Sequence, residues 1–136
     1  MRSAPLVVDT NVVVAGLLTS DPAAPTARIL DAMLRGEARF LLSEELLAEY
    51  RTVLLRPKIA RLHGLTAEEV DEILLRLATN GAVREPPAGA RGPRGDGHLF
   101  ALLEVEPEAW IVSGDAAVLR HAGSRGRTPK QVCGSS

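Results

Sequence analysis

The sequence predicts a three-layer α/β domain in which a central, mostly parallel sheet is flanked by helices. Two short apolar runs, residues 6–8 and 110–112, indicate strands buried on both faces, because they are too short for helices and rich in β-branched residues. Each run leads into an Asp and then into a helical pattern. The alternation of strand-like and helix-like segments along the chain is typical of parallel sheets covered by helices.

Length and composition fit one such domain over residues 1–136. The 136 residues are 46% apolar and 24% charged, which is ordinary for a globular chain with a single core. The net charge of −1 provides no overall basic field that would indicate a nucleic-acid partner. Cys133 is the only cysteine, which excludes an intramolecular disulfide and a cysteine-based metal site. No apolar run approaches the roughly 18 residues of a membrane span and no signal peptide is recognisable, so we expect a cytoplasmic protein without membrane contact.

Helix and strand signals fill the chain between the two buried runs. Ser43 is a good N-cap, and Thr66 forms a capping box with Glu69. Gly36 and Gly81 are typical helix stops. We therefore expect helices over 12–18, from Pro25 to Gly36, from Ser43 to Arg56, over 58–62 and from Thr66 to Asn80, with short strands over 39–42 and 82–84.

The last third of the chain contains a loop, two helices and a polar tail. Residues 85–97 include three Pro and four Gly and no large apolar residue, which predicts a flexible loop. Asp96 is placed to cap a helix over 98–104, and another helix is expected over 116–121. Residues 124–136 are expected to form a polar tail with one edge strand around Arg127. Because the residues after the loop are too few to fold alone, the loop is not a domain boundary.

Four acids stand out by their position. Asp9 and Asp115 follow the two buried strands, and parallel strands bring their carboxyl ends to one sheet edge, where ligands bind in α/β folds. Glu49 lies on the apolar stripe of its helix, where an unpaired carboxylate is costly. Asp96 begins a helix after the loop. Gathered carboxylates repel each other, so at least one pKa should be raised, and a hard cation such as Mg²⁺ or Mn²⁺ relieves the repulsion.

The chemistry that such a site predicts is hydrolysis of a phosphate ester. A divalent ion held by carboxylates can activate one of its waters and stabilise the charge on a phosphodiester. An alternative interpretation of the Asp9-Thr10-Asn11 stretch remains open, because all three residue types are good helix caps.

The four acids also stand in four motifs that resemble, in order, those of PIN domains. The motifs read VDTNV around Asp9, SEELLAEY around Glu49, DGHLFA from Asp96 and IVSGD up to Asp115, and Thr128-Pro129 resembles the closing Thr-Pro of that family. Ser113 stands where the family usually has Thr and keeps the hydroxyl. The segment before Asp96 is rich in Gly and Arg, whereas in the family it is often denser in Asp.

The resemblance to PIN domains implies a ribonuclease that depends on Mg²⁺ or Mn²⁺. Asp9, Glu49, Asp96 and Asp115 would be the catalytic metal ligands, and Asn11 and Ser113 would support them. Many such domains are the toxin components of prokaryotic toxin–antitoxin pairs (the VapC-like type), which often form homodimers and are inhibited by a small antitoxin. The resemblance therefore implies an RNA substrate, an antitoxin encoded nearby and a homodimer as expectations.

An RNA substrate needs a cationic surface, because phosphate contacts supply most of the affinity. Residues 51–63 contain no acid and four cations: Arg51, Arg56, Lys58 and Arg61. Residues 116–136 also contain cations and no acid. The alternative is that both runs are solvated faces. The aromatic residues are few and are expected in the core, so base stacking is not expected to read sequence.

Two other classes of protein compete with the nuclease. A phosphatase of the haloacid-dehalogenase type would need Asp where Asn11 stands, and a phospho-receiver would need a Lys in a position that Lys130 does not fit. A PIN-like module that binds RNA or protein without cutting would keep the fold and lose the activity. His63, His98 and His121 lack the spacing of metal ligands, so the sequence assigns them no role.

Overall fold

The strands form one parallel arrangement in the computed structural model, which describes residues 4–87 and 95–134. Within these ranges the strands are β1 (Leu6–Val8), β2 (Leu41–Leu42), β3 (Ala82–Val83), β4 (Trp110–Val112) and β5 (Gly126–Arg127). β4 pairs in parallel with β1 and with β5, and β2 pairs in parallel with β3. A parallel bridge between Leu6 and Phe40 sets β2 beside β1. The order is therefore β3-β2-β1-β4-β5, and the predicted parallel sheet is confirmed.

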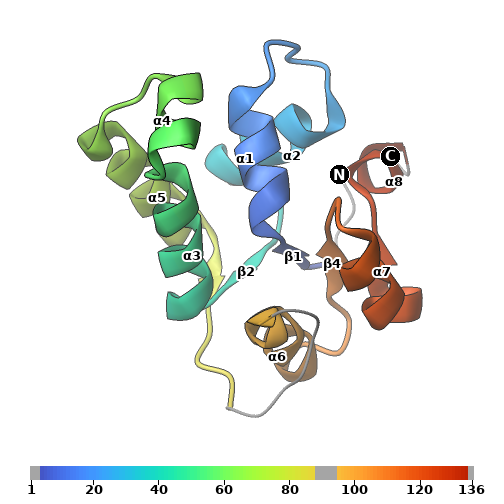
Figure 1. Cartoon of the computed structure of the whole chain (residues 1–136). Coiled ribbons are helices and arrows are strands. Elements are labelled where there is room, and N and C mark those ends of the chain that lie inside the picture. Colours follow the sequence, from blue (N-terminus) through green and yellow to red (C-terminus); the bar gives the residue numbers. More distant parts are fainter. Residues whose placement is uncertain (1–3, 88–94, 135–136) are drawn as a thin grey trace.

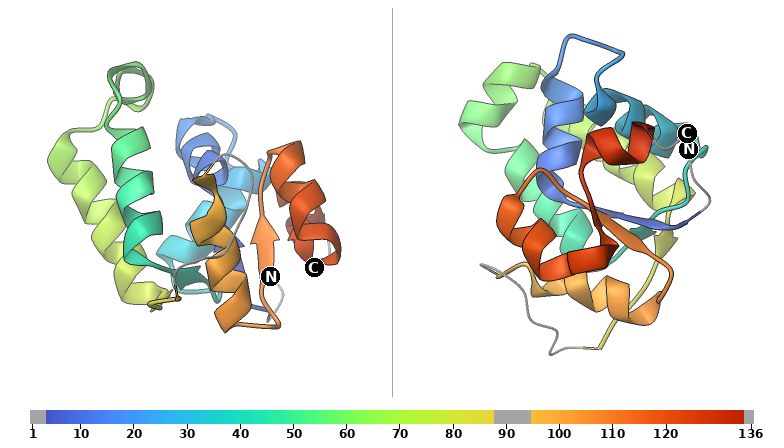
Figure 2. Two further views of the ribbon diagram at one scale, coloured as in Figure 1. Left: turned by 60° about the horizontal axis from the view of Figure 1, so that its bottom comes forward. Right: turned by 90° about the vertical axis from the view of Figure 1, so that its right-hand side faces the viewer.

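Helices cover both faces of these strands. In the described residues they are α1 (Thr10–Leu18), α2 (Pro25–Leu34), α3 (Glu44–Leu54), α4 (Pro57–His63), α5 (Ala67–Asn80), α6 (Gly97–Val105), α7 (Ala116–Ala122) and α8 (Pro129–Gly134). Figure 1 shows α1 and α2 on one face of the strands and α6 on the other, and the right-hand view of Figure 2 shows the same layers. None of the helices described is long and apolar enough to cross a membrane.

The core sits between the central strands and the helices on either face. Each residue of β1 is at most 1% exposed, as expected for a strand covered on both faces. α1 also packs closely on α2. A Cβ at Gly16 would lie 2.6 Å from the backbone oxygen of Thr26, so this helix crossing requires glycine. This packing fixes α1, and with it the residues that follow β1.

The helix ends follow the predicted signals. The Ser43 hydroxyl accepts a hydrogen bond from the Leu46 N–H, and both hydrogen bonds of the Thr66–Glu69 capping box are present. Gly36 follows α2 with φ of 71°. The helix expected from residue 12 starts at Thr10 instead, because Asp9 serves as its N-cap.

The predictions for the end of the chain are partly wrong. The edge strand around Arg127 is β5, but the expected polar tail contains α8, which buries Val132 and Cys133 and packs against α2. Thr128 and Gln131 exchange hydrogen bonds at the start of α8, as in a capping box. Of the loop expected over 85–97, residues 88–94 lie outside the described residues.

The cations near the end of the chain are part of the fold. The Arg125 guanidinium donates to the backbone oxygens of Leu103, Glu106 and Ala109. Arg127 lies 4.1 Å from the centre of the Trp110 ring, which is half-buried. These two Arg therefore hold α6, β4 and the chain end together, and they do not form the solvated face that was the alternative for this run.

Candidate active site and metal centre

The structure brings the four predicted acids to one cavity at the carboxyl ends of β1 and β4. Asp9 precedes α1, Asp115 precedes α7, and Asp96 precedes α6, so three helix N-termini meet there, and α3 supplies Glu49. The cavity has a volume of about 470 Å³. Its lining residues are Asp9, Thr10, Asn11, Glu49, Asp96 and Asp115 at the polar end, and Val14, Ala15, Leu18 and Val53 along α1 and α3.

Asp9 is 5% exposed and is held by three hydrogen bonds. Its Oδ1 accepts from the N–H of Thr10 at 2.8 Å, and its Oδ2 accepts from the Ser113 hydroxyl at 2.7 Å and from the Asn11 side-chain amide at 3.1 Å. The Asn11 Oδ1 accepts from the N–H of Gly114 at 2.9 Å, which ties the start of α1 to the end of β4. Asp9 is thus both the cap of α1 and a carboxylate fixed at the cavity.

Ser113 connects Asp9 to Asp115. Its side chain is fully buried, and its Oγ accepts from the N–H of Asp115 at 2.9 Å while the hydroxyl proton goes to Asp9. Asp115 Oδ1 in turn accepts from the N–H of Ala117 at 2.8 Å and caps α7. The hydroxyl at position 113 therefore orients two of the acids at once.

Glu49 faces the cavity from α3, and its side chain is 34% exposed. One carboxylate oxygen accepts a short hydrogen bond from the Thr10 hydroxyl, and the other lies 3.4 Å from Nε2 of His98. Tyr50, the next residue, is fully buried, and its hydroxyl donates to the backbone oxygen of Val8. Because this bond joins α3 to the end of β1, the register of Glu49 against Asp9 is fixed by the core.

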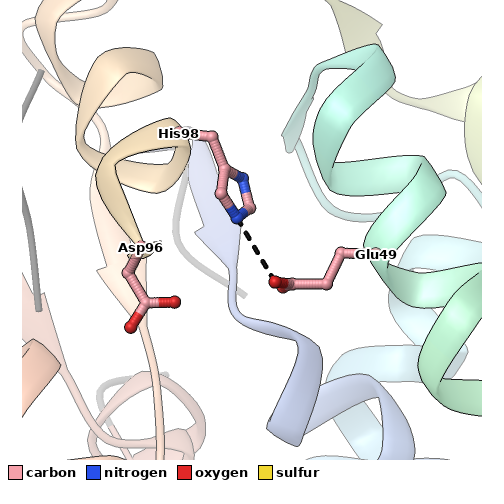
Figure 3. Close-up of side chains that lie close together, drawn as sticks. All are labelled: Glu49, Asp96 and His98. Carbon is pink, nitrogen blue, oxygen red and sulfur yellow. Dashed lines mark ion pairs between the residues drawn. The ribbon is translucent and has the colours of Figure 1, made fainter. Parts of the chain in front are cut away.

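Asp96 occupies the N-cap position of α6, as predicted, but its side chain makes no capping hydrogen bond. Figure 3 shows its carboxylate turned toward the space between α6 and α3, into which Glu49 and His98 also point. One ligand atom from each of these three residues lies within 4.8 Å of the other two. The helix does not use the Asp96 carboxylate, which leaves it available to a ligand.

The pKa values of two acids are raised. Burial is the largest cause for Asp9, opposed by its hydrogen bonds to Ser113 and Thr10 and reinforced by the charges of Glu49 and Asp115. Burial also comes first for the raised pKa of Asp96, followed by the charges of Asp9 and Glu49. The expected rise is therefore present, but desolvation contributes more to it than the repulsion from which it was predicted.

Two residues at the site were missed from the sequence. His98 was assigned no role because the histidines are not spaced as ligands, yet α6 sets its ring beside Glu49. Thr10 was considered only as a cap, yet its hydroxyl holds Glu49. The signal for His98 was its position two residues after an acid at a helix start, which places both side chains at the same end of the helix.

The predicted RNA-binding cations are exposed on α3 and α4. Arg51 forms an ion pair with Asp71 of α5, with Nε 2.8 Å from Oδ1. The stretch 51–63 contains no acid of its own, but the fold supplies one, so the charge of Arg51 is partly neutralised. Arg56, Lys58 and Arg61 are exposed around α4, which packs against α1.

A parallel α/β fold with carboxylates gathered at the carboxyl ends of its strands defines a class of domain suited to hold a divalent metal ion there. The family model described as PIN domain matches residues 5–117, a range that includes all four acids, and the chain belongs to this family. PIN domains are generally nucleases that act on RNA and bind divalent metal ions. No curated protein matches the chain.

The donor set at the cavity fits a divalent cation. Carboxylates from Asp9, Glu49, Asp96 and Asp115 supply the oxygen ligands that Mg²⁺ and Mn²⁺ prefer. Asp96 is not engaged by its own helix, and Nδ1 of His98 is buried without a hydrogen-bond partner among the described residues. Of these two groups, the Asp96 carboxylate lines the cavity and supports the fit of a cation there.

Proposed function

We propose that the protein is a ribonuclease that hydrolyses RNA phosphodiester bonds with Mg²⁺ or Mn²⁺. The observation that carries this proposal is the convergence of Asp9, Glu49, Asp96 and Asp115 on one cavity in a chain of the PIN domain family. A bound divalent ion would activate a water and stabilise the charge that develops on the phosphate.

In this proposal the protein's own residues divide the work. The four carboxylates bind the ion, and Asn11 and Ser113 hold Asp9 and Asp115 in the orientation that binding requires. Thr10 holds Glu49. Partners of this kind restrict the rotation of the ligands, so the metal site needs little rearrangement when the ion binds.

We further propose that RNA reaches the acids along α1. Val14, Ala15, Leu18 and Val53 form an apolar wall of the cavity, which extends from the acids along the length of α1. α4 packs against α1, and Figure 1 shows it beside the end of α1 remote from β1. Arg56, Lys58 and Arg61 would contact phosphates there. Aliphatic residues offer no stacking platform, which favours weak sequence preference in this part of the site.

The test of the nuclease proposal is cleavage of structured RNAs by the full chain in Mg²⁺, in Mn²⁺ and in chelator. We expect cleavage with either metal and none in chelator. The matched pair of variants is Glu49→Gln, at the cavity, and Glu45→Gln, an exposed residue in the first turn of the same helix. Loss of cleavage in the first alone supports the proposal. RNA binding without cleavage in either metal would instead identify a non-catalytic PIN domain.

The biological role that we propose is that of a toxin in a prokaryotic toxin–antitoxin pair. The support is the resemblance of the four acidic motifs to those of toxin PIN domains, which also suggests a homodimer and an antitoxin partner. Induced expression in a bacterial host should arrest growth with the parent protein and not with Asp9→Asn. A small reading frame beside the gene should encode a protein that restores growth. Growth unaffected by the active parent nuclease would contradict the toxin role.

A further inference from the structure

Among the described residues, one group of possible metal ligands consists of Glu49, Asp96 and His98, and is called the metal cluster here. The imidazole of His98 is its one nitrogen donor. Its side chain is only 5% exposed, and its Nε2 faces Glu49 at 3.4 Å, which is beyond the usual length of a hydrogen bond. Its Nδ1 is buried and has no partner among the described residues. A buried ring with neither nitrogen firmly bonded is unusual and requires an explanation.

The geometry around His98 suits an ion bound between α3 and α6. The ligand atoms of Glu49, Asp96 and His98 lie within 4.8 Å of one another. Two donors on one divalent ion, with bonds of about 2.0–2.3 Å, lie at most about 4.6 Å apart. That limit applies to two donors on opposite sides of the ion, and three donors spread evenly around it lie about 4.0 Å apart, so a closure of less than about 1 Å allows all three atoms to bind the same ion. Figure 3 shows that Nε2, and not Nδ1, faces this space.

We propose that His98 is a direct metal ligand through Nε2, and that the site is consequently selective for Mn²⁺ over Mg²⁺. This inference rests on the proposed metal-dependent function and specifies its metal. Mg²⁺ strongly prefers oxygen ligands and gives up its waters reluctantly. Mn²⁺ also binds oxygen well, but as a first-row transition ion it accepts an imidazole nitrogen more readily than Mg²⁺ does. Four carboxylates alone would bind both ions with less discrimination.

An alternative role for His98 is to donate from Nε2–H to Glu49 and so orient that carboxylate. The two roles predict different results for His98→Gln. Loss of a ligand that only Mn²⁺ uses well weakens Mn²⁺ binding, by about tenfold or more, and leaves Mg²⁺ binding nearly unchanged. Loss of a positioning hydrogen bond weakens both metals by the same factor, because both need Glu49.

The experiment measures the Kd of Mn²⁺ and of Mg²⁺ for the parent chain, for His98→Gln and for the control His121→Gln, whose ring contacts Phe100 outside the metal cluster. Electron spin-echo spectroscopy of bound Mn²⁺ provides a second readout that needs no variant. We expect coupling to a ¹⁴N nucleus in the parent, a change of that coupling on ¹⁵N-histidine labelling, and its loss in His98→Gln alone.

Each outcome separates the two proposals. Mn²⁺ bound without nitrogen coupling, or equal weakening of both metals by His98→Gln, overturns the ligand role of His98 and leaves the metal-dependent nuclease intact. Failure of the parent chain to bind either metal overturns the metal-dependent function and this inference with it. If His121→Gln loses the coupling, the nitrogen bound to Mn²⁺ belongs to His121 and not to His98, which also overturns the inference.

Discussion

The two halves of the acidic site are built differently. In the half at the strand ends, Asp9 and Asp115 are capping residues with closed hydrogen-bond networks through Asn11 and Ser113. In the half between α3 and α6, Glu49 has one hydrogen bond from Thr10, and Asp96 has no capping bond. The acids of the first half are therefore engaged by more protein hydrogen bonds than the acids of the second half.

This difference explains how one site combines rigidity with affinity. A carboxylate already bonded to protein donors gains less from a cation than one that is buried without partners. In the proposed metal site, the strand-end half would therefore set the position of the ion, and the helix half would supply much of the gain in free energy on binding. Variants in the two halves should differ in their effects on activity and on stability.

The largest expected effect is that of Asp9→Asn on hydrolysis. Asp9 is the most buried of the four acids, and an amide at this position would place an N–H₂ group against donors from Ser113 and Asn11. We expect cleavage to fall by about 100-fold or more. Initial rates in saturating Mn²⁺ measure the loss, with Asp31→Asn on the exposed surface of α2 as the control. A rate near that of the parent would remove Asp9 from the site.

Glu49→Gln should lower hydrolysis by about 10–100-fold without unfolding the protein. Gln keeps the shape of the side chain and can still accept from the Thr10 hydroxyl, and Tyr50 continues to hold α3 against β1. The rate and the melting temperature are measured on the same preparation. A variant that loses activity only because it melts below the assay temperature would show that Glu49 acts through the fold.

Ser113→Ala tests the strand-end half against the helix half, for which the matched change is Thr10→Val. Removing the fully buried Ser113 hydroxyl takes an acceptor from the backbone N–H of Asp115 and a donor from the carboxylate of Asp9. We expect the free energy of unfolding to fall by about 1–3 kcal/mol. Thr10→Val removes one bond to a partly exposed carboxylate and should cost less. Urea unfolding in chelator gives both values. Equal losses would mean that the halves are equally preorganised.

The sequence predicted the features that depend on local patterns. The buried strands, the acids at their ends and the capping box of α5 each follow from a short stretch of chain. The meeting of Asp9 and Asp115 at one sheet edge follows from the rule that parallel strands bring their carboxyl ends to the same edge, and β1 and β4 are indeed parallel neighbours. Glu49 was found because a charge on an apolar helix stripe contradicts the pattern around it.

Features that depend on contacts between distant segments could not be predicted in this way. The ring of His98 approaches Glu49 only because α6 and α3 pack together, and Arg51 meets Asp71 only because α5 lies against α3. α8 is a different case. The Thr128-to-Gln131 box with Pro129 was readable in the sequence, but the surrounding polar residues favoured a tail.

Asp96→Asn should stabilise the metal-free protein in a pH-dependent way. The pKa of Asp96 is raised above its ordinary value of 3.8, by burial first and by Asp9 and Glu49 next. The folded state therefore holds this proton to higher pH than the unfolded chain does. The protonated Asp96 side chain makes its full contribution to the free energy of unfolding below about pH 3.8, and this contribution is lost as the pH rises through the raised pKa.

At neutral pH in chelator the Asn variant should accordingly melt above the parent, and the difference should shrink toward pH 4. In saturating Mn²⁺ the order should reverse, because the parent gains about 2.7 kcal/mol at a hundredfold excess over Kd and the variant has lost a ligand. Melting curves at several pH values, with and without Mn²⁺, measure both effects. Equal shifts by Mn²⁺ in parent and variant would place the metal away from Asp96.

The smallest expected effect is that of Arg51→Ala, which lies two residues after Glu49 on α3. Its ion pair with Asp71 has both side chains about half exposed, so it is screened by water and salt and contributes little to stability. We expect a slight loss of thermal stability that disappears in high salt, with hydrolysis unchanged, since Tyr50 and not Arg51 fixes the position of Glu49.

The affinity of Arg51→Ala for RNA should fall less than that of the double variant Lys58→Ala/Arg61→Ala, because Asp71 already offsets the charge of Arg51. The salt dependence of RNA binding measures this, with Arg35→Ala/Arg76→Ala, around a different pocket between α2 and α5, as the control. If Arg51→Ala weakens RNA binding as much as the α4 pair does, Arg51 leaves Asp71 to contact phosphate, and the RNA path includes α3 as well as α4.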